Sequence, residues 1–296
     1  MIAGRAFSGS PVPVIALHCS GADGNQWRSL RDALGDAFVL FAPEHFGCER
    51  VGPWPGERAF TINDEAERTL ALIDACEEEV HLVGHSYGGG VALHVAVQRP
   101  KRIASLTLYE PSAFHLLPQI GAAGSRAHAE ISRVAQDTAD RLLDGDCRSG
   151  AAYFIDYWNG AGAFQAMSPR IQAVLTRWAP KIPLDFRALM QATAPLNAYA
   201  TLACPALVLR GEHAPTPTRV IAEALVKLLP HGRLRVVPGC GHMGPLTHAG
   251  LVVPSMVSHI AQAAVASALP AACWATLIAG RGGVTPVELA ACGSSQ

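Results

Sequence analysis

Residues 80–90 read VHLVGHSYGGG, an apolar run that ends in a turn of small residues. The apolar start predicts a buried strand, and the segment after the turn predicts a helix over residues 88–98. Such a sharp turn holds its central residue, here Ser86, in a strained conformation, so the residues two before and two after it must be small. Gly84 and Gly88 meet that demand. The pattern therefore predicts Ser86 as a nucleophile presented at the end of a strand.

Other glycine-rich turns are compatible with some of these letters. A phosphate-binding P-loop needs Lys-Ser or Lys-Thr after its glycines, and neither pair follows here. A dinucleotide-binding turn needs an acidic residue at the end of the next strand, and Glu110 keeps that interpretation open. A plain structural turn is the remaining alternative to a nucleophile at Ser86.

Apolar runs alternate with amphipathic segments on both sides of this turn. The alternation is typical of an α/β fold, a mainly parallel sheet flanked by helices. A further helix is predicted over Asn63–Ala75, with acidic residues in its first turn. Six runs predict strands: Val12–Leu17, Phe38–Phe41, Val80–Val83, Ile103–Tyr109, Ala206–Arg210 and Arg233–Val237.

The alternation stops between residues 112 and 202, where helical patterns rich in Ala, Gln and Arg carry several aromatic residues. This segment is predicted to be an inserted helical lid, and its aromatic residues are expected to form the lid's own core more often than they contact a substrate. Residues 1–111 and 203–270 are then the α/β core. Residues 271–296, rich in Ala and Gly, are expected to form a loosely attached tail.

Composition and charge exclude several classes of function. Lys and Arg total 23 against 24 Asp and Glu, and a net charge of -1 gives no broad attraction to nucleic acid or to anionic membranes. No apolar run suited to a signal peptide or a membrane span is expected, so the chain is interpreted as cytoplasmic. The eight cysteines lack CxxC spacing and are expected to be free thiols, and no metal site is predicted.

Four blocks in the right order resemble the α/β-hydrolase fold family over most of residues 12–268. Residues 17–21, LHCSG, followed by Gln26-Trp27, are similar to the family's oxyanion loop, and residues 42–47, APEHFG, to the loop after its next strand. Residues 84–88 match its nucleophile turn, and residues 239–242, GCGH, its histidine loop. The resemblance implies a serine nucleophile, a histidine base and an oxyanion hole formed by two backbone amides.

The chain departs from the family pattern in three places. Cys19 stands where the family usually has glycine, so the resemblance assigns the first oxyanion amide to Ser20 and the second to Tyr87. About eleven residues precede the first predicted strand, which suggests a shortened N-terminal edge of the sheet. Ala214 occupies the position where the family usually places the aspartate of its triad.

Two glutamates can replace that aspartate, and a third possibility is that no acid is present. Glu110 follows the strand after the nucleophile turn, where some branches of the family, including certain dehalogenases, carry the acid. Glu212 lies two positions before the usual aspartate, and its longer side chain could compensate. Both preserve the order serine, acid, histidine, and Glu110 is the predicted acid.

His242 is the predicted base, because it follows a strand within a glycine-rich loop, and His248 is the alternative. The chemistry expected is hydrolysis of a small carboxylic ester through an acyl group on Ser86, with no cofactor. Hydrolysis of a carbon–carbon bond in a diketone-like substrate uses the same groups and is the enzymatic alternative. A binding or receptor protein with little turnover is the other, suggested by Ala214. The partner expected is a small molecule, and the oligomeric state is not predicted.

Overall fold

The structure, a computed structural model, describes residues 11–268 and contains one six-stranded parallel sheet. Its strand order is β2-β1-β3-β4-β5-β6. The predicted α/β-hydrolase architecture, a mainly parallel sheet flanked by helices, is confirmed. The strands are β1 (Val12–Leu17), β2 (Phe38–Phe41), β3 (Val80–His85), β4 (Ile103–Tyr109), β5 (Ala206–Gly211) and β6 (Gly232–Val237).

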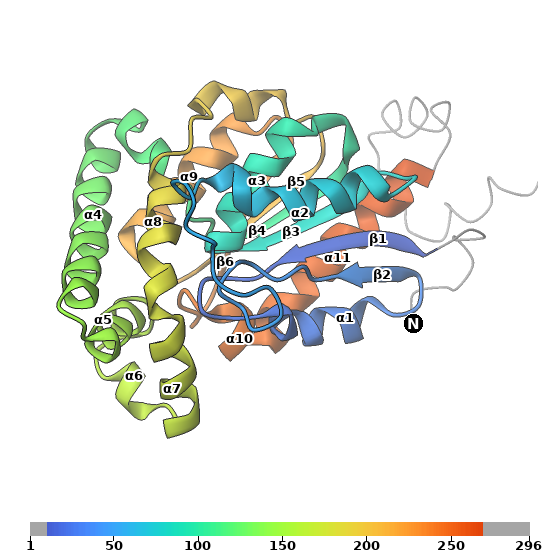
Figure 1. Cartoon of the computed structure of the whole chain (residues 1–296). Helices are drawn as coiled ribbons and strands as arrows, with labels where there is room; N and C mark the ends of the chain where they lie inside the picture. Colours follow the sequence, from blue (N-terminus) through green and yellow to red (C-terminus); the bar gives the residue numbers. More distant parts are fainter. Residues whose placement is uncertain (1–10, 269–296) are drawn as a thin grey trace, which may run out of the picture.

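Helices cover both faces of the sheet and one of its ends (Figure 1). Short 3-10 turns, including η1 (Gly24–Trp27), η3 (Phe114–Gln119) and η4 (Ala179–Lys181), connect several elements. The α-helices are α1 (Arg28–Leu34), α2 (Ile62–Ala75), α3 (Tyr87–Gln98), α4 (Gly121–Leu143), α5 (Cys147–Asn159), α6 (Ala163–Ala166), α7 (Pro169–Trp178), α8 (Ile182–Met190), α9 (Thr216–Leu228), α10 (Gly244–Thr247) and α11 (Ala249–Ala268).

The sheet has an apolar core on each face, because its central strands are mainly apolar and are buried at every position. All residues of β3 and β4 are buried, as expected for parallel strands covered on both sides. Helices α2, α3 and α9 pack on one face together with the helices between β4 and β5. Helices α1 and α11 pack on the other face. The sheet is therefore a rigid platform for the loops at its ends.

The register of the strands places the loops that follow several of them at the same edge of the sheet. Leu17 pairs with Gly84, and His85 pairs with Tyr109, so the ends of β1, β3 and β4 lie side by side. The residues that follow these strands, including Ser86 and Glu110, are therefore neighbours in space although they are far apart in the sequence.

Helices α4 to α8 lie at one end of the sheet (Figure 1), and their buried residues continue the core that α2, α3 and α9 form on one face. They lie between β4 and β5 in the sequence, within the segment predicted as a lid over residues 112–202. Phe154 and Trp158 of α5, and Phe186 of α8, line a cavity together with Ser86. The inserted segment therefore covers the loop that carries Ser86.

Helix α2 begins with a capping box that fixes its first turn. The Thr61 side chain accepts from the backbone at Asp64, while the Asp64 carboxylate accepts from the Thr61 amide at 2.8 Å. Arg58 pairs with Asp64 and closes the loop before the helix. This start positions Glu65, which is buried beneath the inserted segment.

The expectation that no run is apolar enough for a membrane span is wrong for α11. Residues 249–266 have a mean hydropathy of 1.4, and by length and composition this helix could cross a membrane. Val252, Met256 and Ile260 are nonetheless fully buried against the sheet, which is the environment of a core helix.

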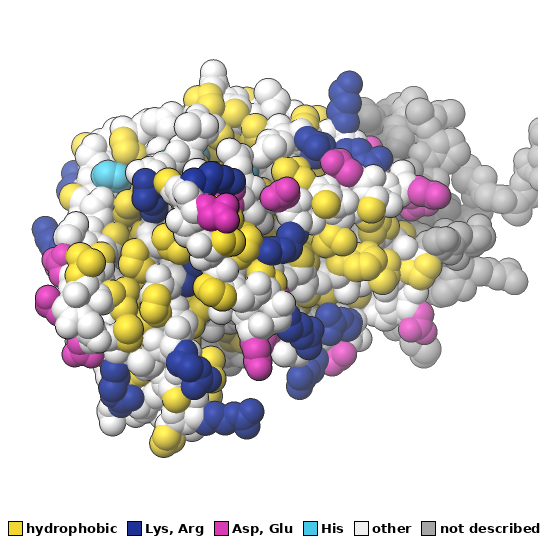
Figure 2. Space-filling view, in the orientation of Figure 1, with side chains coloured by type: hydrophobic (Ala, Val, Ile, Leu, Met, Phe, Trp, Pro, Cys, Tyr) yellow, Lys and Arg dark blue, Asp and Glu magenta, His cyan; other side chains and the backbone are white. Residues whose placement is uncertain are grey.

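Acidic and basic side chains are interspersed on the face of the molecule drawn in Figure 2. The six cysteines within the described residues are free thiols. The predicted tail at 271–296 lies outside the described residues. The predicted shortening of the N-terminal sheet edge concerns residues that lie largely before Pro11, where the description begins.

Candidate active site

Ser86 occupies the turn between β3 and α3 in a left-handed backbone conformation, with φ of 53°. A side chain at φ above zero is strained and persists only where its surroundings enforce it. A Cβ on Gly84 would lie 2.6 Å from the Gly88 carbonyl oxygen, and one on Gly88 would lie 2.4 Å from the carbonyl oxygens of Leu17 and His18. The two glycines are therefore required by close backbone contacts, as the sequence predicted.

His242 lies in the loop after β6, with its Nε2 atom 2.8 Å from Ser86 Oγ. Two hydrogen bonds fix this loop against the sheet. The Tyr109 hydroxyl donates to the Gly241 carbonyl oxygen at 2.7 Å, and His85 Nε2 lies 2.8 Å from the His242 carbonyl oxygen. The imidazole is buried, so it faces Ser86 in one fixed orientation.

Glu110 is the carboxylate that contacts this imidazole. Its Oε2 atom lies 2.7 Å from His242 Nδ1 and accepts from Thr218 Oγ1 at 2.9 Å, while its Oε1 atom accepts from the Gly211 amide at 2.8 Å. Glu110 is fully buried and has a φ of 42°. The strained backbone turns this side chain away from the strand and towards the histidine loop.

The two competing residues lie elsewhere. Glu212 is exposed and accepts from the Gly239 amide at 2.9 Å, so it stabilises the histidine loop from outside. His248 is also exposed, and its Nδ1 lies 2.8 Å from the Thr247 hydroxyl. The structure thus brings together Ser86, His242 and Glu110 and leaves both alternatives outside this group.

Ser20 and Tyr87 line the same small cavity as Ser86. Tyr87 is the first residue of α3, and the first amides of a helix have no partner within it, so they are available to a negative oxygen. Cys19 fits in place of the family's glycine: it is buried, its amide donates to Gln26 Oε1 at 3.0 Å, and burial raises the pKa of its thiol to about 12.

A buried relay of hydrogen bonds links this oxyanion loop to the histidine loop. Because the Cys19 amide can only donate, Gln26 must accept through Oε1 and donate through Nε2 to His85 Nδ1, which lies 3.1 Å away. His85 Nε2 then carries the proton that is donated to the His242 carbonyl oxygen. Burial lowers the pKa of His85, with the charge of His242 adding to the effect, so this neutral tautomer is maintained.

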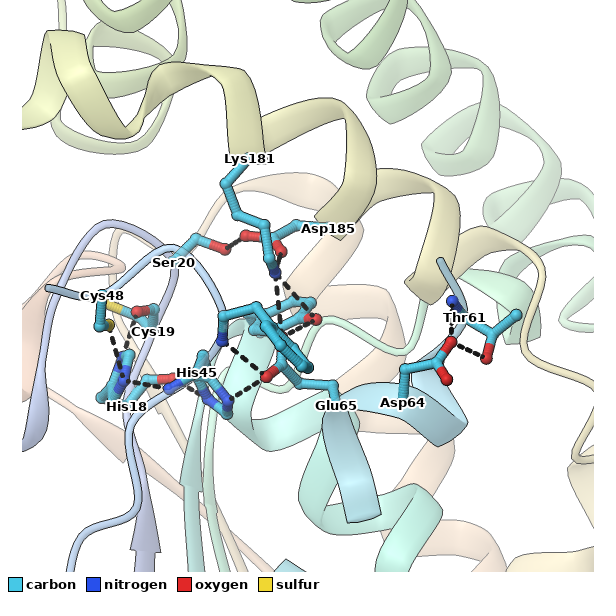
Figure 3. Close-up of polar contacts among 12 residues, drawn as sticks. His18, Cys19, Ser20, His45, Cys48, Thr61, Asp64, Glu65, Lys181 and Asp185 are labelled. Carbon is cyan, nitrogen blue, oxygen red and sulfur yellow. Dashed lines mark hydrogen bonds and ion pairs between the residues drawn. The ribbon is translucent and has the colours of Figure 1, made fainter. Parts of the chain in front are cut away.

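A buried ionic cluster joins the inserted segment to the core below it (Figure 3). Lys181 Nζ lies 2.9 Å from Glu65 Oε2 and also pairs with Asp185. Ser20 Oγ donates to Asp185 Oδ2 at 2.6 Å, and the Tyr87 hydroxyl donates to Glu65 Oε2 at 2.8 Å. The cluster therefore contacts both residues of the predicted oxyanion hole.

The two carboxylates of the cluster respond differently to their surroundings. Burial alone would raise the pKa of Glu65, but the charges of His45 and Lys181 outweigh it and hold that pKa well below its usual range. For Asp185, burial raises the pKa, and the Glu65 charge adds to the rise against the opposing effect of Lys181. Asp185 is thus the carboxylate whose negative charge is less completely balanced.

Sequence reasoning missed this cluster and the role of Trp158. The sequence marks Glu65 only as one of the acidic residues in the first turn of a helix, and it predicts that the aromatic residues of residues 112–202 form mainly a core. Trp158 lies in the core cluster and also stacks on His242, with ring centroids 4.1 Å apart. The one available signal was the concentration of aromatic residues in the inserted segment.

The cavity in front of Ser86 is small, about 10 Å³, and is walled by Phe114, Phe154, Trp158 and Phe186. A larger hollow of about 1100 Å³ adjoins it and also includes Ser20 in its lining. Within residues 11–268, no group of three or more His, Cys, Asp or Glu side chains is arranged to hold a metal ion.

Two curated relatives illustrate what the chain is similar to. It is 34% identical over 103 residues to the lipase LipV of Mycobacterium tuberculosis, a match that covers 34% of this chain and 38% of the lipase. It is 26% identical over 273 residues to the 2-hydroxymuconate semialdehyde hydrolase of a Pseudomonas species, which covers 88% of this chain and 90% of that enzyme. The chain thus spans little more than a third of the first relative and most of the second.

Solved structures share the fold at low sequence identity. An esterase from Thermogutta terrifontis superposes with a TM-score of 0.63 at 22% identity, covering 86% of this chain and 91% of the esterase. A 2-hydroxy-6-oxo-6-phenylhexa-2,4-dienoate hydrolase from a Rhodococcus species has a TM-score of 0.61 at 20% identity, covering 84% and 90%. Residues 14–254 also match the sequence profile of the Alpha/beta hydrolase family. With four fifths of its length in that match, the chain belongs to the Alpha/beta hydrolase family.

Proposed function

We propose that this protein is a serine hydrolase that cleaves a small carboxylic ester through an acyl group carried on Ser86. The observation that carries the proposal is the continuous hydrogen-bonded chain from Ser86 Oγ to His242 at 2.8 Å and from His242 to Glu110 at 2.7 Å. Three groups of these types in this arrangement are what nucleophilic acyl transfer requires.

In the proposed first half-reaction, His242 Nε2 takes the proton of Ser86 as its Oγ attacks the ester carbonyl carbon. The Glu110 carboxylate holds Nδ1 protonated and stabilises the imidazolium that forms. The amides of Ser20 and Tyr87 donate to the developing oxyanion, and the positive end of the α3 dipole favours the same charge. His242 then returns its proton to the leaving alkoxide, and the alcohol departs.

In the second half-reaction, water attacks the acyl group while His242 removes one of its protons. Collapse of the tetrahedral intermediate releases the carboxylic acid and returns the proton to Ser86. These steps balance with the ester and one water molecule, so the residues described supply every group that the sequence of steps uses.

Hydrolysis of a carbon–carbon bond is the second candidate. The 2-hydroxymuconate semialdehyde hydrolase, which aligns over most of both chains, favours it. In that reaction water adds to a ketone carbonyl and the carbon–carbon bond breaks, which gives a carboxylic acid and a carbanion equivalent that takes up a proton of the water. The same three side chains and the same oxyanion donors would serve.

The third alternative, a binding protein with little turnover, rested on the absence of an aspartate at Ala214. Glu110 supplies a buried carboxylate to His242 from another strand, which removes the reason for that alternative. We therefore favour catalysis, with a small molecule as the substrate.

Labelling with a fluorophosphonate tests the proposed nucleophile. We expect the wild type to be labelled on the peptide that carries Ser86, Ser86→Ala to be unlabelled, and Ser258→Ala, a change at an exposed serine of α11, to be labelled at the wild-type rate. Labelling that persists in Ser86→Ala would refute the proposal. Turnover of a short-chain p-nitrophenyl ester, compared with loss of absorbance of a vinylogous diketone, then separates the two enzymatic candidates.

A further inference from the structure

The mechanism above leaves one buried carboxylate of the cavity without a function. Asp185 lines the small space in front of Ser86 together with Ser20, and only 4% of its surface is exposed. It comes from α8 of the inserted segment and lies above Ser20 and Glu65 of the core (Figure 3). A carboxylate is costly to bury, and at this position Lys181 and the Ser20 hydroxyl offset that cost.

Asp185 has fewer polar and charged partners than Glu65. Lys181 pairs with both carboxylates, and Glu65 also accepts from the Tyr87 hydroxyl at 2.8 Å and lies 3.3 Å from His45 Nδ1. Within the described residues, Lys181 is the cation that pairs with Asp185. A donor on a bound substrate would therefore add a partner to this buried carboxylate.

Asp185 retains the capacity to accept another hydrogen bond. Its Oδ2 atom accepts from Ser20 Oγ, and its other oxygen pairs with Lys181. A carboxylate has about four acceptor positions, so two contacts leave room for a donor that arrives from the cavity. The Lys181–Glu65 pair already connects the inserted segment to α2, and Asp185 is therefore not the only ionic contact between these layers.

The remaining walls of the cavity determine what surrounds that donor. Phe114, Phe154, Trp158 and Phe186 are aromatic, and Leu189 is aliphatic. Ser20, whose hydroxyl contacts Asp185, also provides one of the two amides proposed for the oxyanion. A group that reaches Asp185 is thus attached close to the scissile carbonyl, while an apolar group can pack on the rings.

We propose that Asp185 is a specificity-determining residue that selects acyl groups bearing a hydrogen-bond donor, a hydroxyl or an ammonium group, on the carbon next to the scissile carbonyl, with an aromatic or bulky apolar substituent on that carbon. This inference rests on the proposed ester hydrolysis at Ser86. A hydroxyl or ammonium group at that carbon lies within reach of a carboxylate beside the oxyanion loop. An acyl group without the donor leaves an acceptor position of the buried Asp185 carboxylate unfilled.

Three esters that differ in one substituent test the proposal. Ethyl phenylacetate, ethyl mandelate and the ethyl ester of phenylglycine carry hydrogen, hydroxyl and ammonium on the same carbon. For the wild type we expect kcat/KM to be about 10- to 100-fold higher for at least one of the last two than for phenylacetate, the range for one hydrogen bond to a charged group. Mandelate and phenylglycine together distinguish the two kinds of donor.

The variant Asp185→Asn keeps the shape of the side chain and leaves Lys181 paired with Glu65. We expect it to lose the preference, with kcat/KM for phenylacetate changed less than for the favoured ester. The control is Asp137→Asn, a carboxylate of α4 that accepts from the Tyr153 hydroxyl at 2.7 Å and does not line the cavity. It should keep the wild-type preference.

The outcomes separate this inference from the proposed function. A wild type that is not labelled at Ser86 overturns both. A labelled wild type that cleaves the three esters equally, or an Asp185→Asn protein that keeps the preference, overturns the role of Asp185 alone. If Asp185→Asn does not fold, the wild-type order of preference decides. If none of the esters is cleaved, the three corresponding free acids are compared for how well each protects Ser86 from the fluorophosphonate. Equal protection by the three acids overturns the inference.

Discussion

Replacing Glu110 by glutamine changes which nitrogen of His242 carries the proton. The Gly211 amide, which donates to Glu110 Oε1 at 2.8 Å, can only face an oxygen, so the new amide oxygen must take that position. The new NH₂ group then points at His242 Nδ1, 2.7 Å away in the wild type. Since NH₂ donates, Nδ1 becomes the acceptor and the proton moves to Nε2, which can no longer accept from Ser86.

The size of the effect follows from the loss of the base. An isosteric acid-to-amide change in a serine triad that inverts the histidine tautomer costs about 10⁴ in kcat, or about 5.4 kcal/mol of transition-state stabilisation at 1.36 kcal/mol per decade. The fold should tolerate the change, because the volume is unchanged and the Gly211 hydrogen bond is kept. We expect about 10³- to 10⁴-fold slower acylation with little loss of stability.

The assay is the rate of acylation by a short-chain p-nitrophenyl ester, followed as the burst of p-nitrophenol. The matched control is Glu212→Gln, because Glu212 is exposed and contacts the Gly239 amide on the same loop as the histidine. It should change the rate by about threefold at most, as expected for a surface contact. A Glu110→Gln protein that keeps a tenth of the wild-type rate, or a Glu212→Gln protein that loses three orders of magnitude, would refute the assignment.

Three further changes have definite expected outcomes. Gly88→Ala places a Cβ 2.4 Å from two backbone carbonyl oxygens and should prevent soluble expression. Gly90→Ala places a Cβ 2.5 Å from a leucine side chain, which can move, and should yield protein that is folded by circular dichroism. Equal yields of the two variants would contradict the requirement for glycine at position 88. Trp158→Leu removes the ring stacked on the imidazole of the site and should lower kcat about 2- to 30-fold, with Trp158→Phe recovering part of the loss. An unchanged kcat would exclude the stacking effect. Burial lowers the pKa of His81 and of His115 to about 4, below the ordinary 6.5, so between these pH values the unfolded chain binds more protons than the folded protein. The free energy of unfolding should therefore fall by about 1.4 kcal/mol per pH unit for each histidine as the pH drops from 6.5 to 4. Urea unfolding of His81→Gln should show a shallower fall of this free energy with pH.

The nucleophile turn was predictable because its requirements are local. Gly84, Ser86 and Gly88 lie within five residues, and the strand before them and the helix after them are marked by their own apolar patterns. The six strands were predicted within one or two residues of their ends for the same reason. Continuous apolar runs are what a sheet buried on both faces demands.

The sequence limits the candidates for the acid of the triad to two glutamates, but it does not decide between them. The contacts that orient Glu110 come from Gly211 and Thr218, which are 101 and 108 positions away along the chain. Its φ of 42° could not be predicted either, because glutamate seldom adopts a positive φ. The decision depends on which strand ends lie next to each other, and that is set by the packing of the whole sheet.

The polar lining of the cavity could not be predicted for a similar reason. Asp185 and Lys181 are one helical turn apart, a spacing typical of an exposed salt bridge. They become a buried pair because the inserted segment places them over Glu65 and Ser20, which lie in distant parts of the sequence. Periodicity within a helix does not show which core residues it will cover.

The small size of the cavity in front of Ser86 affects how measured ligand affinities of this protein should be interpreted. A space of about 10 Å³ holds about one water molecule, so the described conformation and a bound ester exclude each other. Binding therefore draws on the fraction of molecules in which the cavity is wider, and a measured affinity is the intrinsic affinity multiplied by that fraction. A change that makes the open form about ten times more populated, while it is still a minor form, strengthens every ligand about tenfold without adding a contact. Inhibitors ranked on this protein can thus differ through the cover of the site as well as through their own fit.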